Sequence, residues 1–108
     1  MWIVKPSTVR AFWARHPDAE PFLENWLKVT HAAHWASLQE VRQTFPHADA
    51  VKVSSGGIVT VFNVTGNKYR LLTAIHYNTG MVFILEILPH AQYSRGGRGG
   101  RGGWRDRL

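Results

Sequence analysis

Apolar positions recur at two different periods along the chain, and the change of period divides it into two halves. In the first half they recur every three to four residues, as on one face of an α-helix. Pro6-Ser7-Thr8 and the capping-box pair Ser37 and Glu40 are start signals for helices. This pattern predicts a helix that ends before Pro17, a second over residues 18–35 and a third, shorter one that begins at Ser37.

From Ala50 onward the period changes to two, which is the period of a β-strand. Short connections rich in glycine and asparagine separate the β-rich segments, and connections of this length join antiparallel neighbours. The predicted strands cover residues 50–54, 58–64, 68–77 and 81–88. The sequence therefore predicts an α+β domain, with two to three N-terminal helices followed by a four-stranded antiparallel β-meander.

The two turns around the third predicted strand indicate which side chains share a face of the sheet. If the Gly-Asn pair after the second strand is a two-residue loop, Asn63 lies opposite Arg70. If residues 78–80 form a three-residue loop, Leu72 lies opposite Glu86, which is then a diagonal neighbour of Arg70. We therefore expect Asn63, Arg70 and Glu86 to lie close together on one face.

An arginine in a central strand needs an explanation, because an unpaired buried charge is very costly. One explanation is a structural ion pair between Arg70 and Glu86; the other is a phosphate-binding arginine, whose guanidinium matches phosphate oxygens with two hydrogen bonds. His90, Tyr93 and Lys68 would complete a set suited to RNA cleavage. That reaction needs a proton acceptor, a proton donor and cations near the phosphorus, but no metal.

The positive charge of the chain is concentrated at its end. The net charge is +6, and the stretch 94–108 contains five arginines and one acid, so residues 1–93 have a net charge of only +2. Three of these arginines alternate with glycine pairs, and such a repeat is expected to be flexible. We expect a domain over residues 1–94 and a flexible RNA-binding tail over residues 95–108, with Arg95, Arg98 and Arg101 as mobile contacts.

Other classes of protein are not favoured by the composition. The chain has no cysteine, and its longest apolar run, Met81–Leu85, is far shorter than the roughly 20 residues of a membrane span. We therefore expect a cytoplasmic protein that binds neither a membrane nor a cofactor. His31 and His34 have the spacing of a metal pair but no third ligand stands out, so we expect no metal site, and His16 and His47 are expected to be solvated.

The segment Val61–Leu71 resembles the signature of the HigB-type branch of the RelE/ParE toxin superfamily. Four further segments are similar in the same order along residues 1–94: Pro17-Asp18-Ala19, the Ala33-His34-Trp35 region, Thr44-Phe45-Pro46 and Pro89–Tyr93. The resemblance implies the toxin of a type II toxin–antitoxin system, with a RelE/ParE-like fold. It further implies an endoribonuclease that cleaves mRNA on translating ribosomes and a HigA-like antitoxin as partner.

The resemblance also implies roles for individual residues. Arg70, with Lys68, would contact the scissile phosphate, and His90 would act as general acid or base. Tyr93 would position the 2′-hydroxyl or stack on a base. Glu86 departs from the family pattern and would be either the partner that orients Arg70 or the general base. Asn63 and Asn67 would orient Arg70 or the RNA.

Two other functions stay open from the sequence. The ParE-like members of the superfamily inhibit DNA gyrase by binding, and the same fold serves both activities. An RNA-binding module that acts through the tail is the third hypothesis. The oligomeric state is open as well.

Overall fold

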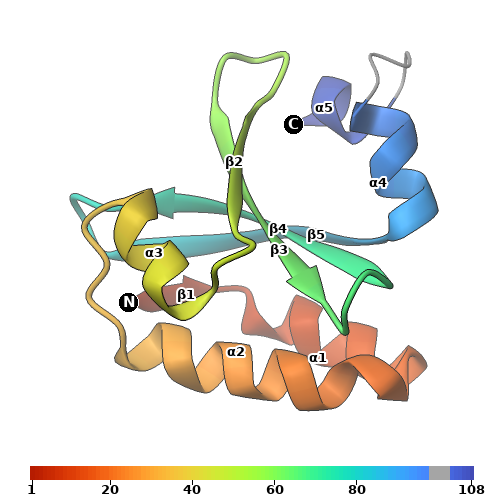
Figure 1. Cartoon of the computed structure of the whole chain (residues 1–108), viewed down its shortest axis with the longest axis horizontal. Helices are drawn as coiled ribbons and strands as arrows, with labels where there is room; N and C mark the ends of the chain where they lie inside the picture. Colours follow the sequence, from red (N-terminus) through yellow and green to blue (C-terminus); the bar gives the residue numbers. More distant parts are fainter. Residues whose placement is uncertain (98–102) are drawn as a thin grey trace.

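The structure, a computed structural model, contains one mixed β-sheet and describes residues 1–97 and 103–108, with only the backbone for residues 95–97. The strands are β1 (Trp2–Val4), β2 (Asp49–Lys52), β3 (Ile58–Val64), β4 (Tyr69–His76) and β5 (Met81–Pro89). The helices are α1 (Pro6–Arg15), the 3₁₀ turn η1 (Pro17–Ala19), α2 (Glu20–Ala32), α3 (Leu38–Thr44), α4 (His90–Gly97) and α5 (Trp104–Arg107). The strand order is β1-β5-β4-β3-β2, with α1 and α2 on the opposite side of the sheet from α4 and α5 (Figure 1).

The N-terminal helices agree with the expected α+β class, with two corrections to the second helix. It begins with the separate turn η1 and ends at Ala32, because Ala33 is extended. Trp35 therefore follows the helix, but it is still buried. The start signal of the third helix is confirmed, since the Ser37 hydroxyl accepts a hydrogen bond of 3.4 Å from the Glu40 N–H.

The meander β2–β5 agrees with the four expected antiparallel strands, but the sheet has a fifth. Strand β1 pairs in parallel with β5, so that Trp2 lies beside Met81 and Val4 beside Phe83. Three residues are too few to display a period of two. This strand forms through its pairing with a distant segment, which local pattern does not reveal.

The register of β3 and β4 is confirmed, because Asn63 pairs with Arg70. The register of β4 and β5 is right at Leu72 and Glu86 but wrong at the turn, where His76 pairs with Met81. The turn is thus one residue longer than expected. A register shift between Leu72 and Thr73 corrects for this difference, since one extra residue of β5 is left between the two parts of the ladder.

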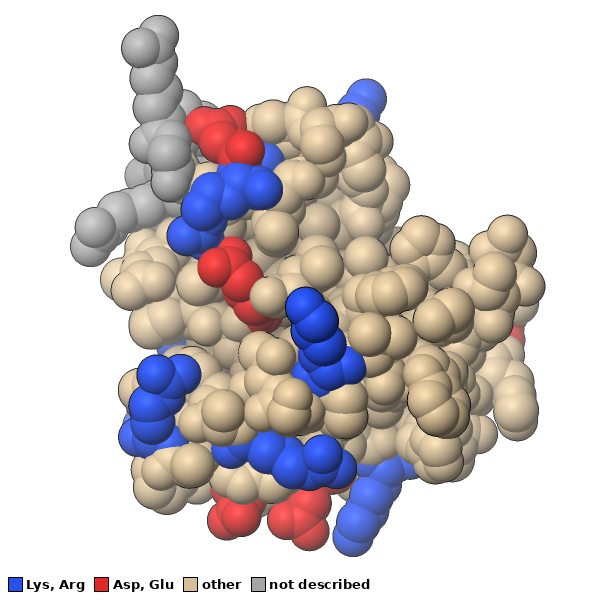
Figure 2. All heavy atoms as spheres, turned by 180° about the vertical axis from the view of Figure 1, so that it is seen from behind, with Lys and Arg blue, Asp and Glu red and all other residues tan. Residues whose placement is uncertain are grey.

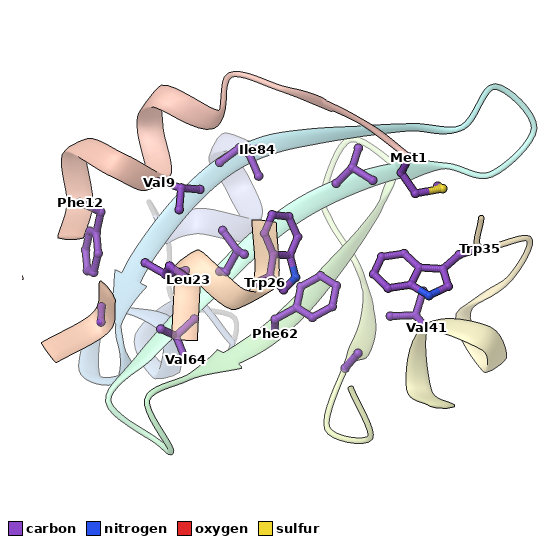
Figure 3. Packing of buried hydrophobic residues seen from close by; sticks show 14 residues of the cluster. Met1, Val9, Phe12, Leu23, Trp26, Trp35, Val41, Phe62, Val64 and Ile84 are labelled. Atoms are coloured by element: carbon purple, nitrogen blue, oxygen red, sulfur yellow. The ribbon is translucent and has the colours of Figure 1, made fainter. Parts of the chain in front are cut away.

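Two hydrophobic clusters lie on the two faces of the sheet. Under α1 and α2, Trp26 is fully buried and its ring meets that of Phe62 edge to face at 5.4 Å (Figure 3). On the other face, Trp104 of α5 packs with Leu72 and Leu88. Each face thus has its own cover, and the second cover comes from the C-terminal end of the chain. In the described ranges 1–97 and 103–108, no helix is both long and apolar enough to cross a bilayer.

Candidate active site

Arg70 lies in β4 on the face opposite α1 and α2, and only 8% of it is exposed. Its guanidinium donates hydrogen bonds to the Tyr69 carbonyl at 3.1 Å and to the Asn67 side-chain oxygen at 3.0 Å. The turn before β4 makes the second bond possible, because Thr65 and Gly66 both have positive φ angles and return the chain sharply. Asn67 thus contacts the guanidinium of Arg70 directly.

Tyr93 extends from α4 to the same site. The Arg70 guanidinium carbon lies 5.5 Å from the centre of the Tyr93 ring, within the range of a cation–π contact. Burial raises the pKa of the Tyr93 phenol, and the negative charge of Asp49 acts in the same direction. Tyr93 is therefore a neutral hydrogen-bonding and stacking group at physiological pH.

Glu86 does not pair with Arg70. Its carboxylate binds Arg107 of α5, with an N–O distance of 2.7 Å. In residues 1–97 and 103–108, no carboxylate forms an ion pair with Arg70. The structure thus contradicts the ion-pair explanation of Arg70. Within the described part of the chain, neutral oxygens and the ring of Tyr93 contact its guanidinium.

Lys68 contacts η1 rather than the Arg70 side chain. Its ammonium lies 2.9 Å from a carboxylate oxygen of Asp18, and the Tyr69 hydroxyl donates to the same carboxylate at 3.0 Å. The hydrogen bond from Lys68 lowers the pKa of Asp18, and that bond raises the pKa of Lys68. Asp18, the first residue of the predicted second helix, thus anchors η1 to the start of β4.

His90 is exposed and is the first residue of α4. Its backbone N–H donates to the Lys68 carbonyl at 2.9 Å, which places it beside the start of β4. The Nε2 atom lies 3.4 Å from the hydroxyl of Ser94. The imidazole is therefore accessible to a ligand. Asn63, which pairs with Arg70 across β3 and β4, is half-buried.

The C-terminal segment (residues 103–108) is packed on this site, in contrast to the flexible tail that we expected. Trp104 is 1% exposed, and its ring is nearly parallel to that of Tyr93, with ring centres 5.2 Å apart. A signal was present in the sequence, since Trp104 and Leu108 are the apolar residues of a stretch otherwise composed of glycine and charged residues. Arg98 and Arg101 lie outside the described residues, and Arg95 is described only by its backbone in α4.

Two of the remaining histidines, His31 and His34, lie at the end of α2 and just after it. Both are exposed, and the described residues contain no group of three possible metal ligands. His16 differs from the expectation, because it is half-buried and stacks on Phe12 at 4.4 Å. On the face seen in Figure 2, lysine and arginine side chains form separate groups rather than one continuous positive field.

The fold and the site define a small α+β protein with a buried arginine on a covered sheet face. A family model described as HigB_toxin, the RelE-like toxic component of a toxin–antitoxin system, matches residues 19–96, more than two thirds of the chain. The chain belongs to this family, which confirms the resemblance seen in the sequence, and an antitoxin is its implied partner. No curated protein matches the chain closely. The match includes β2–β5 and most of α4, but not residues 103–108.

Proposed function

We propose that this toxin is a metal-independent endoribonuclease that cleaves mRNA, and that it does so on translating ribosomes. The observation that supports this most strongly is Arg70, a strand arginine that Asn67 orients and that no described carboxylate neutralises. A guanidinium in this state favours an anionic ligand, and two of its donors can contact the same phosphate.

In the proposed reaction the 2′-hydroxyl of one nucleotide attacks the adjacent phosphorus. The new bond forms a 2′,3′-cyclic phosphate, and the bond from phosphorus to the 5′-oxygen breaks. The proton leaves the 2′-oxygen for a general base, and a general acid gives a proton to the 5′-oxygen. Arg70 stabilises the charge that develops on the phosphate oxygens.

His90 is the proposed general acid, because it is exposed at the start of α4 and a histidine can exchange protons at neutral pH. Glu86 is the proposed general base, since it makes no ion pair with Arg70 and is half-buried on the same face. Tyr93 positions the 2′-hydroxyl or stacks on a base. Lys68, which is bound to Asp18, contributes positive charge at longer range.

Primer extension on cellular mRNA after brief induction tests the proposal. Cuts in phase with codons are expected, and they would establish cleavage on the ribosome. Intact mRNA together with altered DNA supercoiling would instead identify a ParE-like inhibitor of gyrase. A HigA-like antitoxin encoded beside the toxin is expected to restore growth, and this is tested by co-expression of the flanking reading frames.

A further inference from the structure

Residues 103–108 cover the sheet face on which Arg70 lies, and an aromatic stack is the centre of the contact. The Trp104 ring lies on that of Tyr93, which in turn contacts the guanidinium of Arg70. The indole N–H donates to the Tyr93 carbonyl at 3.0 Å. Trp104 therefore contacts both the ring and the backbone of the residue that contacts Arg70.

Polar contacts also attach the same segment to the turn between β2 and β3. The Ser54 N–H donates to the Arg105 carbonyl at 3.0 Å, and the Ser55 hydroxyl donates to the Leu108 carbonyl at 2.7 Å. Both serines belong to the turn between β2 and β3. Figure 1 shows the chain end and α5 beside this turn. The segment is thus docked at defined positions along its whole length.

The docked segment also changes the charge of the site. Arg107 forms its ion pair with Glu86, the carboxylate that we propose as general base. A carboxylate that is bound to a guanidinium is occupied by that partner and is not free to contact the 2′-hydroxyl of a bound RNA. The segment therefore covers the Tyr93 ring with Trp104 and pairs Glu86 with Arg107 at the same time.

A nucleobase matches the place that Trp104 occupies. The indole is a flat bicyclic ring with an N–H donor, similar in size to a purine, and stacking on an aromatic side chain is how single-stranded RNA is commonly bound. The carbonyl of Tyr93 could accept a hydrogen bond from a base amino group in the same way. The Tyr93 ring contacts Arg70 as well as Trp104. A base that replaced Trp104 on this ring would therefore have its phosphate close to the Arg70 guanidinium.

We propose that the surface of Tyr93 beneath Trp104 is a nucleobase subsite, and that residues 103–108 are an intramolecular competitor that fills it in the free toxin. RNA binds when this segment is displaced, and its release also frees Glu86. This inference rests on the proposed function. The segment lies outside residues 19–96, so it is an addition to the part of the chain that the family shares.

The test measures binding of a short single-stranded RNA that has 2′-O-methyl groups throughout and is not cleaved. Trp104→Ala in the full chain should tighten binding about tenfold, as expected if the open form is about one tenth of the population. A double variant, Ser54→Ala with Ser55→Ala, removes the hydroxyl hydrogen bonds to Asp106 at 2.6 Å and to the Leu108 carbonyl at 2.7 Å, keeps every charge and should also tighten binding. Trp2→Ala is the matched control, because that tryptophan is 66% exposed at the other end of the sheet.

Hydrogen exchange of the Ser54 amide gives a second readout, because this N–H is bonded to residue 105 only while the segment is docked. Exchange should accelerate when RNA is added and in Trp104→Ala. Unchanged or weaker RNA binding by Trp104→Ala would overturn the inference even if mRNA is cleaved in cells. Tighter binding by this variant without cleavage in cells would support the subsite and reject the proposed nuclease.

Discussion

Glu86 binds Arg107, 2.7 Å away on α5, and not Arg70, its diagonal neighbour across the sheet. This leaves the Arg70 guanidinium oriented by Asn67 without a carboxylate partner among the described residues. A structural arginine would gain most from an acid in contact with it, whereas a phosphate-binding arginine needs its charge uncompensated. The identity of Glu86's partner therefore favours a ligand-binding role for Arg70.

Arg70→Lys should abolish growth inhibition, because lysine keeps the charge but cannot donate two parallel hydrogen bonds to a phosphate. The loss of one such transition-state donor costs about 10²–10³-fold in rate. Since Arg70 is buried, we expect the substitution to lower the free energy of unfolding by about 1–3 kcal/mol, because the hydrogen bonds to Asn67 and Tyr69 are lost. Cleavage assays and circular dichroism measure both effects, with exposed Arg10→Lys as control. Full toxicity of Arg70→Lys would exclude the phosphate contact.

His90→Asn should lower single-turnover RNA cleavage by about 10²–10⁴-fold, the usual contribution of a general acid or base. Binding of uncleavable RNA should remain unchanged, because His90 is exposed and its structural bond is made by the backbone. His34→Asn, a change of another exposed histidine, is the control. A variant that loses binding and cleavage together would place His90 in RNA recognition rather than in proton transfer.

RNA cleavage should continue in excess EDTA, because the proposed reaction uses only protein groups. The assay uses purified toxin and a short RNA, without ribosomes, whose own integrity needs magnesium. Loss of activity that added Zn²⁺ restores would point to a metal site, and His31 and His34 would be the first candidates to replace.

The Asp18 carboxylate should stabilise the fold only above acidic pH. The Lys68 hydrogen bond lowers the pKa of Asp18 from the usual 3.8. The stabilisation by the charged carboxylate is therefore fully present above pH 3.8 and is lost as the pH falls through the lowered pKa. Wild type and Asp18→Asn should therefore differ in Tm at pH 7 and converge below pH 3.8. Glu24→Gln, in an exposed pair with Lys28, is the control. An equal difference in Tm at every pH would show that the carboxylate charge is not responsible.

Trp26→Ala should destabilise the protein by about 3–5 kcal/mol, because it removes a fully buried ring from the core between α2 and the sheet. Trp2→Ala should change the free energy of unfolding by at most about 0.5 kcal/mol, since Trp2 is largely exposed. Denaturant unfolding followed by circular dichroism compares the two. Equal costs would mean that Trp2 is packed in solution.

The sequence by itself determined the α+β class, the order of helices and strands, and the face of β4 that carries Arg70. These follow from local causes: the period of apolar positions, the Ser37 cap, and turn residues that allow only antiparallel neighbours. The pairing of Asn63 with Arg70 was predictable for the same reason. Family membership was visible because its signature, Val61–Leu71, is one continuous segment within the matched residues.

Only the tertiary structure decided the partners of the charged groups. Whether Glu86 pairs with Arg70 or Arg107, and whether Lys68 turns to Asp18, depends on segments that are distant in sequence and on side chains with several rotamers. The packing of Trp104 on Tyr93 was hidden for a related reason. A short segment rich in glycine and arginine has no period of its own, so its conformation is set by the apolar sheet face that accepts it.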